Sequence, residues 1–203
     1  MSRKKHYVTL LTEYPFGVLA PEKFDIYSAR KLLEEEHYGM EKLKKRILEF
    51  IAVSKLKGEF KSKVLLLYGP PGVGKTSIVK SIAKCLNRPY SRVSLGGEYD
   101  TALVKGHRRT YIGAYPGKIW DSIYRSKVEN PVILLDEIDK IVTRSGGSSL
   151  QDAVMEVLDP VQNHRFKDDF MDVEIDLSRV LFICTANSLD TIFPPLLDRL
   201  ERI

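Results

Sequence analysis

The chain has 203 residues, 43% of them hydrophobic and 29% charged, and its formal net charge at pH 7 is +5. These values are typical of one soluble globular domain, and they exclude a disordered or fibrous chain. No apolar run approaches the length of a membrane span, and the first residues lack the apolar core of a signal peptide. We therefore expect a soluble intracellular protein without membrane contact.

The N-terminal part, residues 1–31, is expected to be a helical connector. Pro15 and Pro21 interrupt regular structure within it. A helical region is predicted over residues 28–56, with a glycine-containing break. Residues 32–203 are then expected to hold the main α/β domain.

The basic residues are spread along the chain, and four of them lie on one predicted helix that also has an apolar face. These four are Lys42, Lys44, Lys45 and Arg46. The simplest interpretation places all four on the solvated side of an amphipathic helix. Because a basic balance can also mark nucleic-acid binding, contact with DNA stays open as an alternative.

A phosphate-binding loop is predicted after the apolar run Val64–Tyr68, which has the character of a buried strand. The loop has the spacing G-x-x-x-x-G-K-T and consists of Gly69, Pro70, Pro71, Gly72, Val73, Gly74, Lys75 and Thr76. Its glycines allow backbone N–H groups to face phosphate oxygens, and the helix expected over Lys75–Leu86 presents its positive dipole end to the same charge. The alternative is a chance glycine-rich turn, and the order of strand, loop and helix argues against it.

The polar side chains of this loop have expected roles in binding a nucleoside triphosphate. Lys75 is expected to reach the β- and γ-phosphates, and the Thr76 hydroxyl to hold Mg²⁺. Ser77 belongs to the same nucleotide-binding set.

A second segment approaches the site from the other side. Residues 132–135 are long enough for one buried parallel strand, which ends in Asp136 and Glu137. Asp136 is expected to hold Mg²⁺ directly or through water. Glu137 is the natural general base for the water that attacks the γ-phosphate. Helix capping is the alternative role for such acids, and the nearby phosphate loop favours the catalytic one.

Strands and helices alternate along the rest of the chain. The further elements are expected over Tyr90–Ser94, 117–126, Leu150–Leu158 and 180–186. This alternation predicts a parallel sheet with helices on both faces and ligand at the carboxyl ends of the strands. Cys85 lies in the helix expected over Lys75–Leu86, and Cys184 lies in the strand expected over 180–186. Their spacing is unlike that of metal ligands, so we expect both to be buried and unpaired.

Two residues near the C-terminus are candidates for catalysis. Asn187 follows the strand over 180–186, where an amide can orient the attacking water and sense the γ-phosphate. A turn residue is the alternative for Asn187. Arg199 follows a proline-rich turn and is a candidate arginine finger for a neighbouring subunit, which requires a ring.

The order of these parts resembles an AAA+ ATPase module, with the P-loop NTPase fold. Several intervening strings are more specific and resemble the ATPase part of the Lon protease family. They are EHYGMEK at 36–42, SLGG at 94–97, GHRRTYIGA at 106–114, EVLDP at 156–160 and TANSLD at 185–190. The likeness runs from about residue 7 to the last residue.

The resemblance implies a hexameric ring that unfolds proteins and feeds them to a proteolytic chamber. Tyr111 and Ile112 match the aromatic-aliphatic pair that grips the polypeptide in the central channel. Gly113 and Gly117 are interpreted as giving this loop mobility. Core packing is the alternative for Tyr111. A second channel loop is expected near residues 144–149, where the sequence departs from the family pattern.

The same resemblance places His37, Tyr38 and Gly39 in the adenine pocket, with Tyr38 offering a flat apolar surface. A plain turn between helices is the alternative for this tripeptide.

The family also has parts that this sequence does not supply. By this resemblance, the family's proteolytic serine and lysine and its helical subdomain, which carries a second arginine sensor, are expected beyond residue 203. Residues 200–203 are expected to begin a strand at one side of the sheet. We therefore expect an ATPase fragment without peptidase activity. The alternatives are a nucleotide-binding module without turnover and a DNA-handling AAA+ ATPase.

Overall fold

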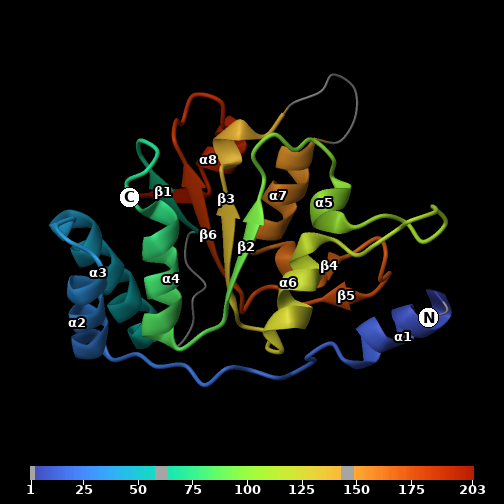
Figure 1. The fold of residues 1–203 in the computed structure, drawn as a ribbon, viewed down its shortest axis with the longest axis horizontal. Helices are drawn as coiled ribbons and strands as arrows, with labels where there is room; N and C mark the ends of the chain where they lie inside the picture. Colours follow the sequence, from blue (N-terminus) through green and yellow to red (C-terminus); the bar gives the residue numbers. More distant parts are fainter. Residues whose placement is uncertain (1–2, 58–63, 143–148) are drawn as a thin grey trace.

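A five-stranded parallel sheet forms the centre of the computed structural model, which describes residues 3–57, 64–142 and 149–203 (Figure 1). The strand order is β2-β3-β6-β1-β7, and every neighbouring pair is parallel. The strands are β1 (Val64–Tyr68), β2 (Tyr90–Ser94), β3 (Val132–Asp136), β6 (Leu181–Ala186) and β7 (Leu200–Arg202). The predicted α/β fold with a parallel sheet is confirmed, including the strand at the end of the chain.

Helices cover both faces of the sheet (Figure 1). One face carries α2 (Ile26–Glu36), α3 (Glu41–Lys57) and α4 (Lys75–Leu86). The other carries α5 (Ala102–Lys105), α6 (Lys118–Ser126), α7 (Leu150–Leu158) and α8 (Pro194–Leu197), and α1 (Arg3–Thr12) packs at the margin of this layer. Short pieces complete the fold: η1 (Ile138–Lys140), η2 (Asn163–Arg165) and the antiparallel pair β4 (Phe166–Lys167) and β5 (Glu174–Ile175).

The alternation of side chains along each strand builds two separate cores. Leu65 and Leu67 of β1 pack against α2 to α4, whereas Leu66 packs on the opposite face. Both faces therefore need apolar residues, which is why these strands appear in the sequence as continuous apolar runs. Trp120 of α6 is fully buried in the second core.

The N-terminal region contains more regular structure than Pro15 and Pro21 suggest. Helix α1 precedes both prolines, and α2 begins two residues earlier than expected because the Asp25 side chain accepts a hydrogen bond from the Tyr27 N–H. Helix α2 crosses residue 31, where the sequence suggests the end of the connector.

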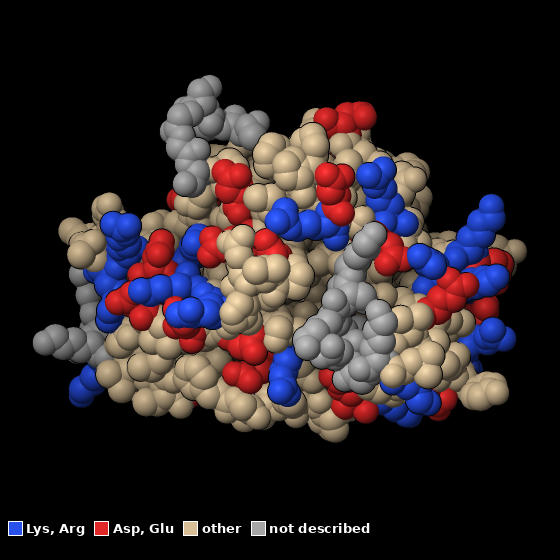
Figure 2. Space-filling model, turned by 180° about the vertical axis from the view of Figure 1, so that it is seen from behind, with Lys and Arg blue, Asp and Glu red and all other residues tan. Residues whose placement is uncertain are grey.

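The assignment of Lys44 to a solvated face is wrong. Its side chain is only 3% exposed, and its ammonium pairs with Glu34 of α2 at 2.7 Å. Burial between helices gives this lysine a local partner, because an unpaired buried ammonium would be costly. Figure 2 shows acidic and basic side chains interspersed over the face seen there.

Cys85 and Cys184 are buried and free, as expected. Within the described parts of the chain, no helix is both long and apolar enough to cross a membrane.

Candidate active site

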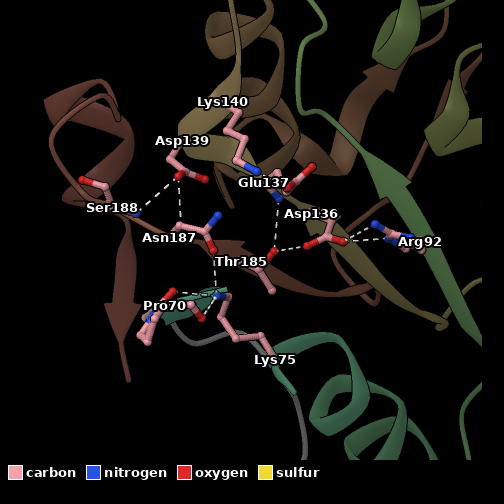
Figure 3. A network of polar contacts seen from close by, with 11 residues as sticks. Pro70, Lys75, Arg92, Asp136, Glu137, Asp139, Lys140, Thr185, Asn187 and Ser188 are labelled. Atoms are coloured by element: carbon pink, nitrogen blue, oxygen red, sulfur yellow. Dashed lines mark hydrogen bonds and ion pairs between the residues drawn. The ribbon is translucent and has the colours of Figure 1, made fainter. Parts of the chain in front are cut away.

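Three predicted site segments meet at the carboxyl edge of the sheet because β6 lies between β1 and β3. The loop at 69–74 follows β1, Asp136 ends β3, and Asn187 follows β6. Parallel strands bring these positions to one edge, where ligands bind in open α/β sheets. Figure 3 shows the polar contacts that join them.

The phosphate loop has a backbone that requires glycine. Gly72 and Gly74 have φ values of +81° and +89°, a region that other residues rarely adopt. Gly74 is the N-cap of α4, and it provides no side-chain cap for the first N–H groups of the helix. Thr76 and Ser77 lie in the first turn of that helix, so the N–H groups near them are available to an anion.

Lys75 is held by three neutral oxygens. Its ammonium donates to the carbonyls of Gly69 and Pro70, at 2.6 and 2.9 Å, and to Oδ1 of Asn187 at 2.8 Å. The asparagine predicted as a sensor therefore touches the lysine predicted to bind phosphate. None of these three acceptors neutralises the charge of Lys75, so an anionic ligand would bind it more strongly.

Asp136 is 5% exposed and has two partners (Figure 3). Its Oδ2 accepts from Nε of Arg92 on β2 at 2.7 Å, and its Oδ1 accepts from the hydroxyl of Thr185 on β6. The Thr185 oxygen in turn accepts the backbone N–H of Glu137 at 3.1 Å. Thr185 thus joins the two predicted acidic residues.

Glu137 has a backbone conformation that non-glycine residues seldom adopt, with φ +61° and ψ +47°. This left-handed conformation costs roughly 1–2 kcal/mol, and such strain is common at functional sites. Its carboxylate pairs with Lys140, which raises the pKa of that lysine. A Cβ at Gly96 would lie 2.5 Å from Oε2 of Glu137, so a larger residue there would displace the carboxylate from this position.

Asp139 fixes the backbone at Asn187, the asparagine predicted as a sensor. Its Oδ2 accepts the N–H groups of Asn187 and Ser188 at 3.1 and 3.2 Å. The strand end is therefore held on one side while the Asn187 amide contacts Lys75 on the other.

Arg199 lies at the other end of the sheet from this site. The next residue, Leu200, is in register with Val64 at the start of β1, whereas Ala186 pairs with Tyr68 at its end. Four residues of strand correspond to roughly 13 Å. Within the chain the Arg199 guanidinium donates to Oδ2 of Asp159 at 2.9 Å.

The pKa of Asp159 is lowered, first by the backbone N–H of Val161 and then by Arg199. Arg199 is therefore a charged, partly exposed group outside its own chain's site.

The tripeptide at 37–39 joins α2 to α3 beside α4. His37 is buried, its Nε2 lies 2.7 Å from Oγ of Ser81, and desolvation lowers its pKa. Tyr38 is fully exposed, and Gly39 has a φ of +68°. The contact of this turn with adenine stays a prediction.

Tyr111 and Ile112 are 63% and 91% exposed, so the core-packing alternative for Tyr111 is wrong. Gly113 has a φ of +79°, as a turn at the loop tip requires. Gly117 has an ordinary φ of −66°, and a Cβ there would lie 2.1 Å from the Val104 carbonyl. Gly117 therefore serves close packing, in contrast to its interpretation as a mobile residue. Of the second expected loop, residues 144–148 lie outside the described part.

Sequence reasoning missed four residues of this network, namely Arg92, Thr185, Asp139 and Lys140. Thr185 and Asp139 each stand two or three positions from a predicted site residue, which is a weak signal. No such signal surrounds Arg92, because its contact with Asp136 depends on the parallel pairing of β2 with β3.

Comparison with known proteins agrees with this geometry. The family described as "ATPase family associated with various cellular activities (AAA)" matches residues 65–203, and the family "PrkA AAA domain" matches residues 18–94. The chain is 56% identical over 199 residues to the mitochondrial Lon protease homolog of Homo sapiens and 55% identical over 199 residues to that of Drosophila melanogaster. It is 54% identical over 198 residues to the Lon protease of Cytophaga hutchinsonii.

Each match covers 98% of this chain but only 21%, 19% and 24% of the respective relative. The chain thus spans about a fifth of the length of these relatives. Because the family match takes in most of the sheet and the site described above, the chain belongs to the AAA family of ATPases, and its module is of the kind that Lon proteases contain.

Proposed function

We propose that this module binds ATP with Mg²⁺ and hydrolyses it as the motor of a Lon-like protease. The observation that carries the proposal is the contact between Lys75 and Asn187, which lies beside Asp136 and Glu137 at one edge of the sheet. A phosphate-binding lysine, a polar sensor, a metal carboxylate and a base are the parts that phosphoryl transfer requires.

The residues fit a nucleotide with its metal. The three acceptors of Lys75 are neutral, and the backbone at Gly72 and Gly74 leaves open space where a Cβ would stand. Among the described residues, no group of three or more His, Cys, Asp or Glu side chains could hold a metal ion. Thr76 and Asp136 offer the oxygen ligands that suit Mg²⁺, which is usually bound by one or two protein oxygens together with phosphates and water.

Bound Mg²⁺ would neutralise the charge that develops on the transferred phosphoryl group. The chain's own residues do the rest. Lys75 and the N–H groups of the loop hold the phosphates, and Asn187 orients the attacking water. Once its carboxylate has separated from Lys140, Glu137 accepts the proton of that water.

The parent protein's activity is a wider proposal. Its hexameric ring would unfold damaged proteins and pass them to a peptidase domain outside this chain. Tyr111 and Ile112 would grip the polypeptide, and Arg199 would act on the ATP of a neighbouring copy. His37, Tyr38 and Gly39 would contact adenine. The compartment would be the bacterial cytoplasm or an organelle such as the mitochondrial matrix.

One observation supports a second candidate, a nucleotide-binding module without turnover. Arg199 lies at the far end of the sheet and is paired with Asp159, so a single chain cannot supply the finger to its own site. A chain that does not assemble would then bind ATP and hydrolyse it slowly.

ATP turnover measured across a wide range of protein concentration distinguishes the two. The matched variants are Glu137→Gln, which removes the base, and Glu98→Gln, which neutralises a nearby exposed carboxylate. Turnover that rises with concentration, that Glu98→Gln keeps and that Glu137→Gln loses by about 100-fold or more supports the motor. Tight binding of a fluorescent ATP analogue without turnover at any concentration supports the second candidate. Failure to bind the analogue overturns both.

A further inference from the structure

The loop that carries Tyr111 and Ile112 has a narrow base. It leaves the body of the module at Gly106 and returns at Gly117, where α6 begins. Just above this base, the backbone N–H of His107 donates to the carbonyl of Tyr115 at 3.0 Å. The two sides of the loop are therefore bonded to each other near its base, which we call the neck, and the exposed tip lies beyond it.

Asp168, which the proposed chemistry does not use, lies at this neck. It follows β4 and is fully buried. Its Oδ2 accepts the N–H of Gly117 at 2.7 Å. Its Oδ1 accepts the N–H groups of Phe170 and Met171, both at 2.9 Å. One carboxylate thus joins the end of the loop to the turn after β4.

Gly106 leaves the space that this carboxylate occupies, and Gly117 leaves space for the backbone at the other end of the loop. A Cβ at Gly106 would lie 2.8 Å from Oδ1 of Asp168 and 2.8 Å from the nitrogen of Gly117. A Cβ at Gly117 would meet the Val104 carbonyl. Both ends of the loop and the carboxylate can therefore meet only because neither end has a side chain.

A second set of contacts ties the same turn to the N-terminal helix. The hydroxyl of Tyr7 donates to the Met171 carbonyl at 2.9 Å, and the Arg109 guanidinium lies 4.3 Å from the centre of the Tyr7 ring. Arg109 is part of the loop, so the loop is held both at its neck and on its flank.

Burial of a carboxylate is costly even with three N–H partners, and desolvation raises the pKa of Asp168 to about 6. An apolar side chain would fill this space without that cost. It would not supply two oxygens that accept from the loop and from the turn at once.

We propose that Asp168 is the positioning residue of the loop that carries Tyr111 and Ile112. By holding the Gly117 N–H, it fixes the neck and so directs the exposed pair away from the body of the module. The significance of this anchor for substrate rests on the proposed role of the loop in gripping polypeptide.

Asp168→Asn tests the hydrogen bond to the loop separately from the hydrogen bonds to the turn after β4. The amide keeps Oδ1 for Phe170 and Met171, but its NH₂ group faces the Gly117 N–H, so only the bond to the loop is lost. Asp169→Asn is the matched control, because it makes the same charge change at the adjacent exposed position.

The readout is a nitroxide attached at Ile112→Cys, which labels selectively because Cys85 and Cys184 are buried. We expect the rotational correlation time of the nitroxide to fall by about twofold or more in Asp168→Asn, and to be unchanged in Asp169→Asn. Affinity for a fluorescent ATP analogue should stay within about twofold in both, since the neck lies outside the nucleotide site. Unchanged nitroxide mobility in a folded Asp168→Asn variant overturns the proposal.

If Asp168→Asn does not fold, residue-resolved hydrogen exchange of the unaltered chain decides. Slow exchange of the Gly117 amide supports the anchor, and exchange as fast as at the loop tip overturns it. A photocrosslinker at position 112, offered reduced and carboxymethylated lactalbumin, tests the grip separately. If the nitroxide becomes more mobile in Asp168→Asn but the unaltered chain forms no crosslink, the anchor is supported and the grip on polypeptide is refuted. If the unaltered chain forms the crosslink but the mobility does not change in Asp168→Asn, the grip is supported and the anchor is refuted.

Discussion

The ammonium of Lys75 lies 2.8 Å from the side-chain oxygen of Asn187, and this contact joins the loop after β1 to the end of β6. Both residues are expected to meet the γ-phosphate, so they form a site before any ligand arrives. A phosphate that binds Lys75 must compete with Asn187 for the same ammonium. The strength of that contact therefore sets part of the affinity for nucleotide.

Asn187→Asp should lower the affinity for ATP by about 10-fold or more. The new carboxylate would pair with Lys75 and repel the phosphate, and a charged hydrogen bond of this kind is worth about 1.5–3 kcal/mol. Titration with a fluorescent ATP analogue measures the change. Asn187→Ala, which adds no charge, should stay within about threefold in affinity while losing turnover. Equal losses of affinity in the two variants would contradict this explanation.

Arg92→Ala should lower the Mg²⁺ concentration needed for half-maximal nucleotide binding, by about fivefold. Arg92 pairs with the carboxylate that is expected to hold the metal, and its side chain is 51% exposed, so the pair contributes only about 1 kcal/mol. The measurement is an Mg²⁺ titration at fixed ATP analogue. Arg125→Ala removes an exposed ion pair with Asp121 on α6 and should have no effect. A higher Mg²⁺ requirement in Arg92→Ala would mean that the arginine helps the bound state.

Thr185→Val should destabilise the module by about 2–3 kcal/mol. Thr185 is 1% exposed, and valine of the same shape leaves both the Asp136 carboxylate and the Glu137 N–H without this partner. Thr185→Ser keeps the hydroxyl and loses one buried methyl group, which costs about 1 kcal/mol. Urea unfolding measures both. A serine variant as unstable as the valine variant would show that the methyl group matters as much as the hydrogen bonds, and would contradict this explanation.

The stability that Asp168 contributes should fall as the pH rises from about 4 to about 6. Burial raises its pKa from 3.8 to about 6, with a smaller contribution from Asp169, so the folded chain binds the proton more tightly than the unfolded chain. The corresponding loss is about 3 kcal/mol. The free energy of unfolding of the unaltered chain, relative to that of Asp168→Asn, should therefore decrease across this range. A constant difference between the two would contradict the raised pKa.

Arg199→Ala should bind the ATP analogue with unchanged affinity, because Arg199 lies at the far end of the sheet from its own chain's site. Its turnover at high protein concentration should fall by about 10³-fold, as expected for a missing finger. Mixing it with Glu137→Gln should restore part of the turnover, since each variant supplies what the other lacks. Mixtures that remain inactive would argue against Arg199 acting across chains.

Local patterns were sufficient to predict the main parts of the site. The apolar runs, the loop spacing and the pair Asp136-Glu137 each lie within a short stretch of sequence. A strand buried on both faces needs an unbroken apolar run, and a loop that wraps a phosphate needs glycines at set positions. These requirements act on neighbours in the chain, so the sequence by itself determined the fold class and the candidate nucleotide site.

Contacts between distant segments were decided only by the tertiary structure. Thr185 meets Asp136 because β6 pairs with β3, and Arg92 reaches the same carboxylate because β2 pairs with β3. Lys44, which the helical pattern places on a solvated face, and Asp168 are likewise charged residues that the fold buries. Strand order and helix packing bring such residues to their partners, and the periodicity of one segment carries no information about which other segment packs against it.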